Sequence, residues 1–272
     1  MPKKDNQRSK AKKRARQEEL QREKERQVRV KAANFNDDGS VRNTLSDFVS
    51  FQKFARNGHD LTVSFDAGST VEEPVSSEMF CILKENMEQL YTQSGWGWKE
   101  SEKRGEHKDD MARFLIARNK DGNILGFTHF RFLLENSLEV LYIYELQVSK
   151  MGRRAGLGRH MMVLCELMAR KQGMQKVMLT VFKDNLPAMN FYLTKMKYGI
   201  DETSPSMSQD EEDQSATYEI LSKRIAPPKV PVINAATRAM SPNAVSEEVI
   251  ASLTDGKLKP LTAVTSALKS SP

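Results

Sequence analysis

The chain has 272 residues, of which 39% are hydrophobic, and a formal net charge of +6. This length allows one sizeable core, but the low hydrophobic fraction indicates that part of the chain lies outside it. No stretch is long and apolar enough to span a membrane, and the N-terminus has no apolar signal region, so we expect no membrane association. The two cysteines, Cys81 and Cys165, occupy apolar helical positions and predict buried thiols in a reducing compartment. The four histidines lack metal-ligand spacing, so we expect no metal site.

The charge is unevenly distributed along the chain. Residues 1–32 contain thirteen Lys or Arg against five Asp or Glu, a net +8, which leaves −2 for the remainder. We predict a basic arm at 1–32 that is disordered or a solvated helix, one folded domain at 33–225, and a disordered, proline-containing tail at 226–272. The basic run at 10–16 suits a nuclear import signal or a contact with the ribosome or another nucleic-acid partner. A flexible solubilising tail is the alternative.

The hydrophobic pattern predicts the following elements in chain order. Leu45, Phe48, Phe51 and Phe54 predict a short helix that ends at Asn57-Gly58. A strand (61–65), a helix (77–91) and a charged connection (100–110) follow, and then strands at 113–117, 124–132 and 140–148 with turns at 119–122 and 136–137. After a loop come a helix from 157 to about 173, a strand (177–182), a helix (186–196), an acidic loop (209–214) and a strand (217–223). We expect an α/β (α+β) fold with a mixed, mostly antiparallel sheet flanked by helices.

The loop after the strand 140–148 carries the most specific pattern, Arg153-x-x-Gly156-x-Gly158. Glycine lets the backbone approach a ligand closely, and a helix that begins here directs free N–H groups and a positive dipole end at that ligand. Three arginines, Arg153, Arg154 and Arg159, add positive charge, so the pattern favours a pyrophosphate. An ordinary strand-to-helix turn with solvated arginines is the alternative.

These motifs together resemble a known superfamily. The sequence Arg-Arg-Ala-Gly-Leu-Gly at 153–158, then Leu179-Thr180-Val181 and Asn185-x-x-Ala188-x-x-Phe191-Tyr192, is similar to the acetyl-CoA core of the GCN5-related N-acetyltransferase (GNAT) superfamily. Five segments resemble its histone-selective N-alpha-acetyltransferase branch, the N-terminal acetyltransferase D type: 91–99, 129–132, 142–147, 177–183 and 204–208. The resemblance runs from about residue 30 to 224 and implies the GNAT fold.

The resemblance and the residues together suggest catalytic groups and acetyl-CoA contacts. Glu145 lies in an apolar strand, where burial raises a carboxyl pKa, and is the expected base, with Tyr144 beside it. A structural, ion-paired Glu145 is the alternative. Strict alternation would place Tyr144 and Glu145 on opposite faces, but the family has a bulge in this strand. The resemblance further implies that the Leu146 amide binds the thioester oxygen. It also implies that Leu146, Gln147 and Val148 pair with the pantetheine arm and that Asn185 forms a hydrogen bond with it. The pyrophosphate would be held by the loop residues Arg153, Arg154, Ala155, Gly156, Leu157, Gly158 and Arg159.

The resemblance also implies a set of peptide contacts, namely Tyr91, Trp96, Leu133, Glu135, Tyr142, Tyr144, Thr180, Thr203 and Tyr218. The family has an acidic residue where this chain has Leu133, and Glu135, on the same strand face, could substitute for it. We also expect Glu139 and the acidic loop near this groove. Thr203 stands where the family has serine. Tyr192 could protonate the leaving thiolate or be a core residue.

The expected function is transfer of an acetyl group from acetyl-CoA to the N-terminal serine α-amine of histones H-four and H-two-A, whose tails begin Ser-Gly-Arg-Gly. The resemblance implies a monomer in cytoplasm and nucleus. A lysine or small-amine acetyltransferase on the same fold is one alternative, because a fold does not fix the substrate. A non-enzymatic module that binds RNA or the ribosome through the basic arm is another. The segment 200–218 should distinguish the enzymes, because a tyrosine-bearing loop over the site would admit a chain end and hinder an internal lysine.

Overall fold

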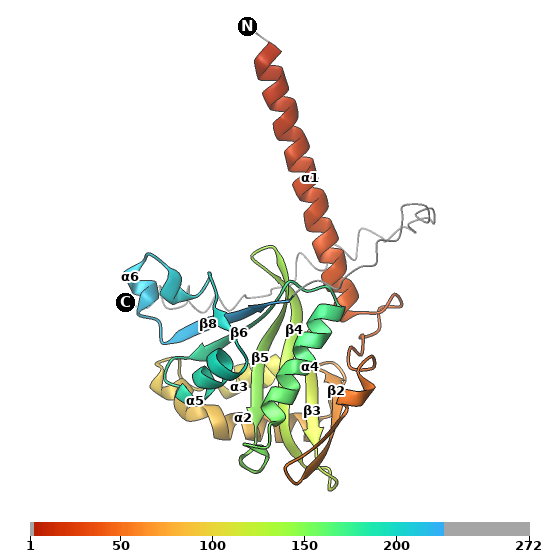
Figure 1. Ribbon diagram of the computed structural model, residues 1–272, viewed down its shortest axis with the longest axis vertical. Coiled ribbons are helices and arrows are strands. Elements are labelled where there is room, and N and C mark those ends of the chain that lie inside the picture. The colour runs from red at the N-terminus through yellow and green to blue at the C-terminus, as the bar shows by residue number, and fades with distance from the viewer. Residues whose placement is uncertain (1–2, 226–272) are drawn as a thin grey trace. The chain divides into compact units, whose positions relative to one another are not determined.

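The strands of the described residues form one eight-stranded sheet, and helices cover both of its faces (Figure 1). The computed structural model describes residues 3–225. The strand order is β1-β2-β3-β4-β5-β6-β8-β7, and all neighbours are antiparallel except the parallel pair β5–β6. The predicted mixed, mostly antiparallel sheet is therefore confirmed. The strands are β1 Lys53–Arg56, β2 His59–Ala67, β3 Arg113–Arg118, β4 Ile124–Glu135, β5 Leu138–Val148, β6 Lys176–Phe182, β7 Gly199–Ile200 and β8 Tyr218–Arg224. The α-helices are α1 Lys3–Asn34, α2 Glu73–Gln93, α3 Glu100–His107, α4 Leu157–Lys171, α5 Leu186–Asn190 and α6 Glu211–Gln214.

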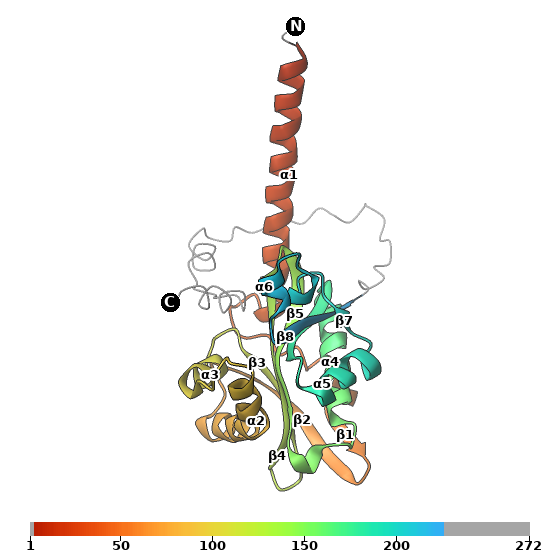
Figure 2. The same ribbon diagram turned by 90° about the vertical axis from the view of Figure 1, so that its left-hand side faces the viewer.

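Each face of the sheet has its own core (Figure 2). Helices α2 and α3 lie on one side, and α4 and α5 lie on the other. The predicted amphipathic helix α4 buries an apolar stripe that includes Met161, Leu164 and Cys165. Helix α2 buries Phe80 and Leu83 in the opposite core. Full burial of each such side chain contributes about 1.5–3 kcal/mol, so both helices are fixed against the sheet.

The helix predicted from Leu45 to Asn57 is wrong. Only a short 3₁₀ turn, Val49–Phe51, forms, and Phe54 lies in β1. Asn57 and Gly58 have φ of 50° and 80° and connect β1 to β2. Asn-Gly readily adopts the positive φ angles of a two-residue hairpin turn, so this dipeptide joins two strands and does not end a helix.

Other expectations on the C-terminal side of this hairpin need smaller corrections. The charged connection at 100–110 contains helix α3. Cys165 is buried as predicted, but Cys81 is exposed. The predicted helix at 186–196 consists of α5 and a π-helical turn, Phe191–Lys195. The acidic loop contains the short helix α6.

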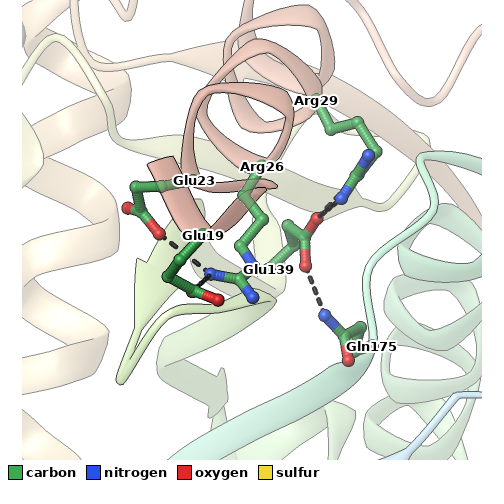
Figure 3. A network of polar contacts seen from close by, with 6 residues as sticks. All are labelled: Glu19, Glu23, Arg26, Arg29, Glu139 and Gln175. Carbon is green, nitrogen blue, oxygen red and sulfur yellow. Dashed lines mark hydrogen bonds and ion pairs between the residues drawn. The ribbon is translucent and has the colours of Figure 1, made fainter. Parts of the chain in front are cut away.

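The last turns of α1 contact the folded domain. Buried Glu139, on β5, accepts a hydrogen bond from Arg29 Nε at 2.6 Å, and Gln175 donates to its other oxygen (Figure 3). Asn34 Nδ2 donates to the Phe132 carbonyl at 2.9 Å. Helix α1 thus continues past the expected arm boundary at residue 32, and its C-terminal end is fixed to β4 and β5. The expected tail at 226–272 lies outside the described residues. Among residues 3–225, no helix is long and apolar enough to cross a membrane.

Candidate active site

A β-bulge brings the two expected catalytic side chains to one face of the sheet. His129 of β4 lies opposite Glu145, whereas the next residue, Phe130, lies opposite Ile143, so Tyr144 is the extra residue in β5. The Tyr144 ring stacks on His129 with centroids 4.9 Å apart, and Glu145 faces Lys103 on α3. Because the bulge cancels strict alternation, both side chains point to the α2–α3 side of the sheet.

Glu145 lies in a buried polar environment. Its side chain is 5% exposed, Gln147 Nε2 donates to its Oε2 at 2.8 Å, and Lys103 Nζ lies 3.7 Å from its Oε1. Burial raises the pKa of Glu145, while Lys103 and the Gln147 hydrogen bond oppose the rise. The predicted direction of the pKa is therefore confirmed. Both the base and the ion-paired alternative remain compatible with these contacts, since a raised pKa suits a base and the lysine contact suits an ion pair.

Lys103 is a site residue that the sequence reasoning missed. Its Nζ forms a closer ion pair with Glu106, at 2.9 Å, and lies 4.9 Å from the Tyr91 ring centroid. Burial opposes its charge, but Glu145 and its other acidic neighbours outweigh that effect and raise the Lys103 pKa. The sequence signal that could have placed Lys103 on a helix was the spacing of opposite charges at 99–106.

The strands β5 and β6 separate beside the bulge. Their pairing runs from Val140–Lys176 to Ile143–Leu179 and ends there. The Ser149 amide donates toward β4, to the Leu125 carbonyl, so by alternation the amides of Leu146 and Val148 face the separation. An extended ligand arm could pair with β5 there, as the resemblance implies for pantetheine.

The glycine loop ends at the first residue of α4. Gly156 is the N-cap, with φ of 94°, and Arg154 also has a positive φ of 62°. Ala155 and Leu157 are buried and anchor the loop, whereas Arg153 and Arg159 are exposed. The first-turn amides of α4 have no carbonyl within the helix to bind, and the helix dipole adds to the arginine charge. This arrangement fits a pyrophosphate.

Asn185 and Tyr192 come from the segment after β6. Asn185 caps α5, since its Oδ1 accepts from the Ala188 amide at 3.3 Å, which leaves its Nδ2 as the side-chain donor. Tyr192 is 8% exposed, packs against Phe191 and Tyr198, and has its pKa raised by burial and by Glu145. Tyr192 is thus a core residue.

Several of the expected peptide contacts join two aromatic clusters on the α2–α3 face. Trp96 contacts Tyr91 and Tyr218, with ring centroids 6.2 and 5.2 Å apart, and Phe182 packs beside Tyr91 and Trp96. The hydroxyls of Tyr142 and Thr180 lie 2.6 Å apart, and the Tyr142 ring is 5.5 Å from that of Tyr144.

Other expected polar contacts are engaged elsewhere. Thr203 is exposed, and its hydroxyl donates to Asp201 at 2.7 Å. Glu139 accepts hydrogen bonds from Arg29 and Gln175, so the expectation that it lines the groove is wrong. It is buried where the basic helix α1 contacts β5, and there it binds Arg29. Leu133 packs with Tyr142, and half-buried Glu135 has its pKa raised by burial and by Asp201. Within residues 3–225, Glu135 has no ion pair, and no group of three or more His, Cys, Asp or Glu could hold a metal.

Part of the chain is similar to known acetyltransferases. Residues 79–198 match the model of the acetyltransferase (GNAT) family. Similar solved structures include nourseothricin acetyltransferase (22% identity, 43% of this chain and 66% of that one, TM-score 0.35). Others are Ard1 from Thermoplasma volcanium (17%, 60% and 98%, 0.44) and PaiA N-acetyltransferase from Thermoplasma acidophilum in complex with coenzyme A (14%, 60% and 99%, 0.44). The match thus spans just under two thirds of the nourseothricin enzyme.

The segment similar to the acetyltransferase (GNAT) family thus includes the β5 bulge and the glycine loop.

Proposed function

We propose that this acetyltransferase modifies the α-amine of an N-terminal serine, in histone tails of H-four and H-two-A that begin Ser-Gly-Arg-Gly. The observation that carries the proposal is a closed aromatic wall. Trp96, from the loop after α2, contacts Tyr218 at the start of β8, and Thr217 Oγ1 donates to the Ser94 carbonyl at 3.4 Å. A wall that joins two separate segments suits a narrow chain end and hinders a lysine within a continuous peptide.

The chemistry of the residues suits an α-amine. Its pKa is about 7.7–8.0, so roughly a quarter of these amines are neutral near pH 7.4, against about one lysine in a thousand. Acetyl-CoA supplies the acetyl group. The amine nitrogen would bond to the acetyl carbon while Glu145 accepts the amine proton and the Leu146 amide donates to the carbonyl oxygen. The carbon–sulfur bond would then break, and coenzyme A would leave as a thiolate that takes up a proton from water. Tyr144, whose pKa is raised by burial, stays neutral and can donate a hydrogen bond in the site.

The alternative is a lysine or small-amine acetyltransferase, because the glycine loop and Glu145 suit any amine. Further parts of the proposal concern the setting of the enzyme. We propose that it acts as a monomer in cytoplasm and nucleus, and that the exposed basic residues of α1 contact the ribosome or another nucleic-acid partner.

Mass spectrometry tests the proposal directly. The full chain is incubated with acetyl-CoA and a Ser-Gly-Arg-Gly peptide that carries a downstream lysine. One acetyl group on the α-amine, and none on the same peptide with a blocked N-terminus, is the expected result. Acetylation of the blocked peptide would favour the lysine alternative. The variant Gly156→Glu is the control, because a side chain is strained at φ of 94° and a carboxylate repels the pyrophosphate, so it should bind no acetyl-CoA.

A further inference from the structure

Asn86 of α2 lies between the glycine loop and Glu145, although nothing in its sequence surroundings indicates a role at the site. Arg153 Nη2 donates to Asn86 Oδ1 at 2.5 Å. Asn86 Nδ2 donates to Gln147 Oε1 at 3.0 Å and to the Val148 carbonyl at 3.2 Å. Gln147 Nε2 in turn donates to Glu145 Oε2 at 2.8 Å. These contacts form one continuous chain of hydrogen bonds from a loop arginine to the expected base.

We propose that Asn86 is a positioning residue that holds Arg153 for the pyrophosphate and, through Gln147, orients the Glu145 carboxylate. The proposal rests on the proposed function, because it takes Glu145 as the base and the glycine loop as the acetyl-CoA site.

Two residues of this hydrogen-bond chain are buried, so the loss of one bond should affect the others. Gln147 and Glu145 are each 5% exposed, so water cannot readily replace a lost partner. The Asn86 bond to Gln147 Oε1 fixes the Gln147 amide with its Nε2 toward Glu145, where it favours the ionised carboxylate. At the other end, Arg153 is exposed, and a long guanidinium side chain loses less entropy on binding a phosphate when it is already held.

Several other charged or titratable groups surround Glu145 and stay in place when Asn86 is changed. Lys103 and Glu106 approach from α3, Tyr91 from α2, Tyr192 from the π-helical turn, and His129 from β4. A shift in the pH profile of Asn86→Ala, which adds no charge, would therefore report the lost hydrogen bond and not a changed charge.

Two substitutions distinguish the effect of Asn86 on Arg153 from its effect on Glu145. Asn86→Asp keeps an oxygen for Arg153 but loses the donor to Gln147, whereas Asn86→Ala loses both. Acetyl-CoA affinity is measured by calorimetry, which needs no peptide, and kcat is measured against pH with Ser-Gly-Arg-Gly peptide. Gln89→Ala, which removes a side-chain amide at an exposed position on the same helix, is the matched control.

We expect Asn86→Ala to weaken acetyl-CoA binding about tenfold, because an Arg153 side chain that is no longer held must be immobilised on binding, and to move the acidic limb of the kcat profile to higher pH. Asn86→Asp should keep the affinity within about twofold and show only the pH shift. Gln89→Ala should match the wild type. Unchanged affinity and pH profile in Asn86→Ala, or an equal fall of kcat at every pH with unchanged affinity, would overturn the assignment. An inactive wild type that still binds acetyl-CoA would instead contradict the proposed function.

Discussion

The surroundings of Glu145 shift its pKa in opposite directions. Burial disfavours its charge, whereas Lys103 and Gln147 favour it, and the net effect is a raised pKa. Lys103 lies closer to Glu106 than to Glu145, so Glu145 is not its nearest ion-pair partner. A raised pKa suits the proposed role of Glu145 as the base.

The substitution Glu145→Gln should lower kcat at least tenfold and leave acetyl-CoA affinity nearly intact, because the amide keeps the shape but cannot accept a proton. In the wild type, kcat should rise with pH as Glu145 ionises, at a pH above its ordinary pKa of 4.5. The variant should retain only the rise that belongs to the peptide amine. Kinetics between pH 5 and 9 check this, and an unaltered kcat and profile would make Glu145 a structural residue.

At the level of elements, local patterns predicted much of the fold and less of the site. The segment from β5 through the glycine loop to β6 follows the predicted order, because each piece has strong periodicity or a specific loop. The β1–β2 hairpin was missed although Asn57-Gly58 indicates it, since four apolar residues at helical spacing suggested otherwise. Lys103 and Asn86 could not be predicted, because their roles arise only when α2 and α3 pack over β5.

The contact of α1 with the domain allows a stability prediction. Glu139 is 1% exposed and its pKa is lowered, because the hydrogen bonds from Gln175 and Arg29 outweigh the effect of burial. Arg29→Ala should therefore destabilise the fold by about 1–3 kcal/mol, below the range for a fully buried pair because Arg29 is half exposed. Urea unfolding measures this. A lowered pKa gives stability that is present above pH 4.5 and is lost as the pH falls, so the difference between wild type and variant should shrink in acid.

Arg14→Ala is the matched control for Arg29→Ala. Its ion pair with Glu18 lies on the exposed part of the same helix, where the side chains are 83% and 51% exposed. Such a pair contributes about 0–1 kcal/mol, so the control should unfold nearly like the wild type. Equal effects of the two substitutions would show that the Arg29 contact does not fix α1 to the domain.

In the described domain, the two faces of the sheet carry different groups of candidate site residues. Helices α2 and α3 lie on one side of the sheet and α4 lies on the other (Figure 2). The glycine loop leads into α4, whereas Lys103 of α3 faces Glu145 and Tyr91 of α2 contacts Trp96 of the aromatic wall. Beside the bulge, β5 no longer pairs with β6, and this gap joins the two faces of the sheet. Glu135 lies on the same strand as His129 and on the face of Leu133, so a peptide bound at the aromatic wall could reach it along β4.

Selectivity for a histone tail should depend on Glu135. Replacing the arginine of Ser-Gly-Arg-Gly by alanine should cost about 1.5–3 kcal/mol in kcat/KM, the range for a hydrogen bond to a charged group. Glu135→Ala should cause most of the same loss, because this half-buried carboxyl has no ion pair among residues 3–225, and an arginine would compensate its burial. Combining the two changes should cost less than their sum, whereas Glu102→Gln, at an exposed carboxylate on α3, should change nothing. Additive losses would show that Glu135 does not contact the arginine. If the wild type accepts both peptides equally, the enzyme is a broader N-terminal acetyltransferase that does not read the third residue of its substrate.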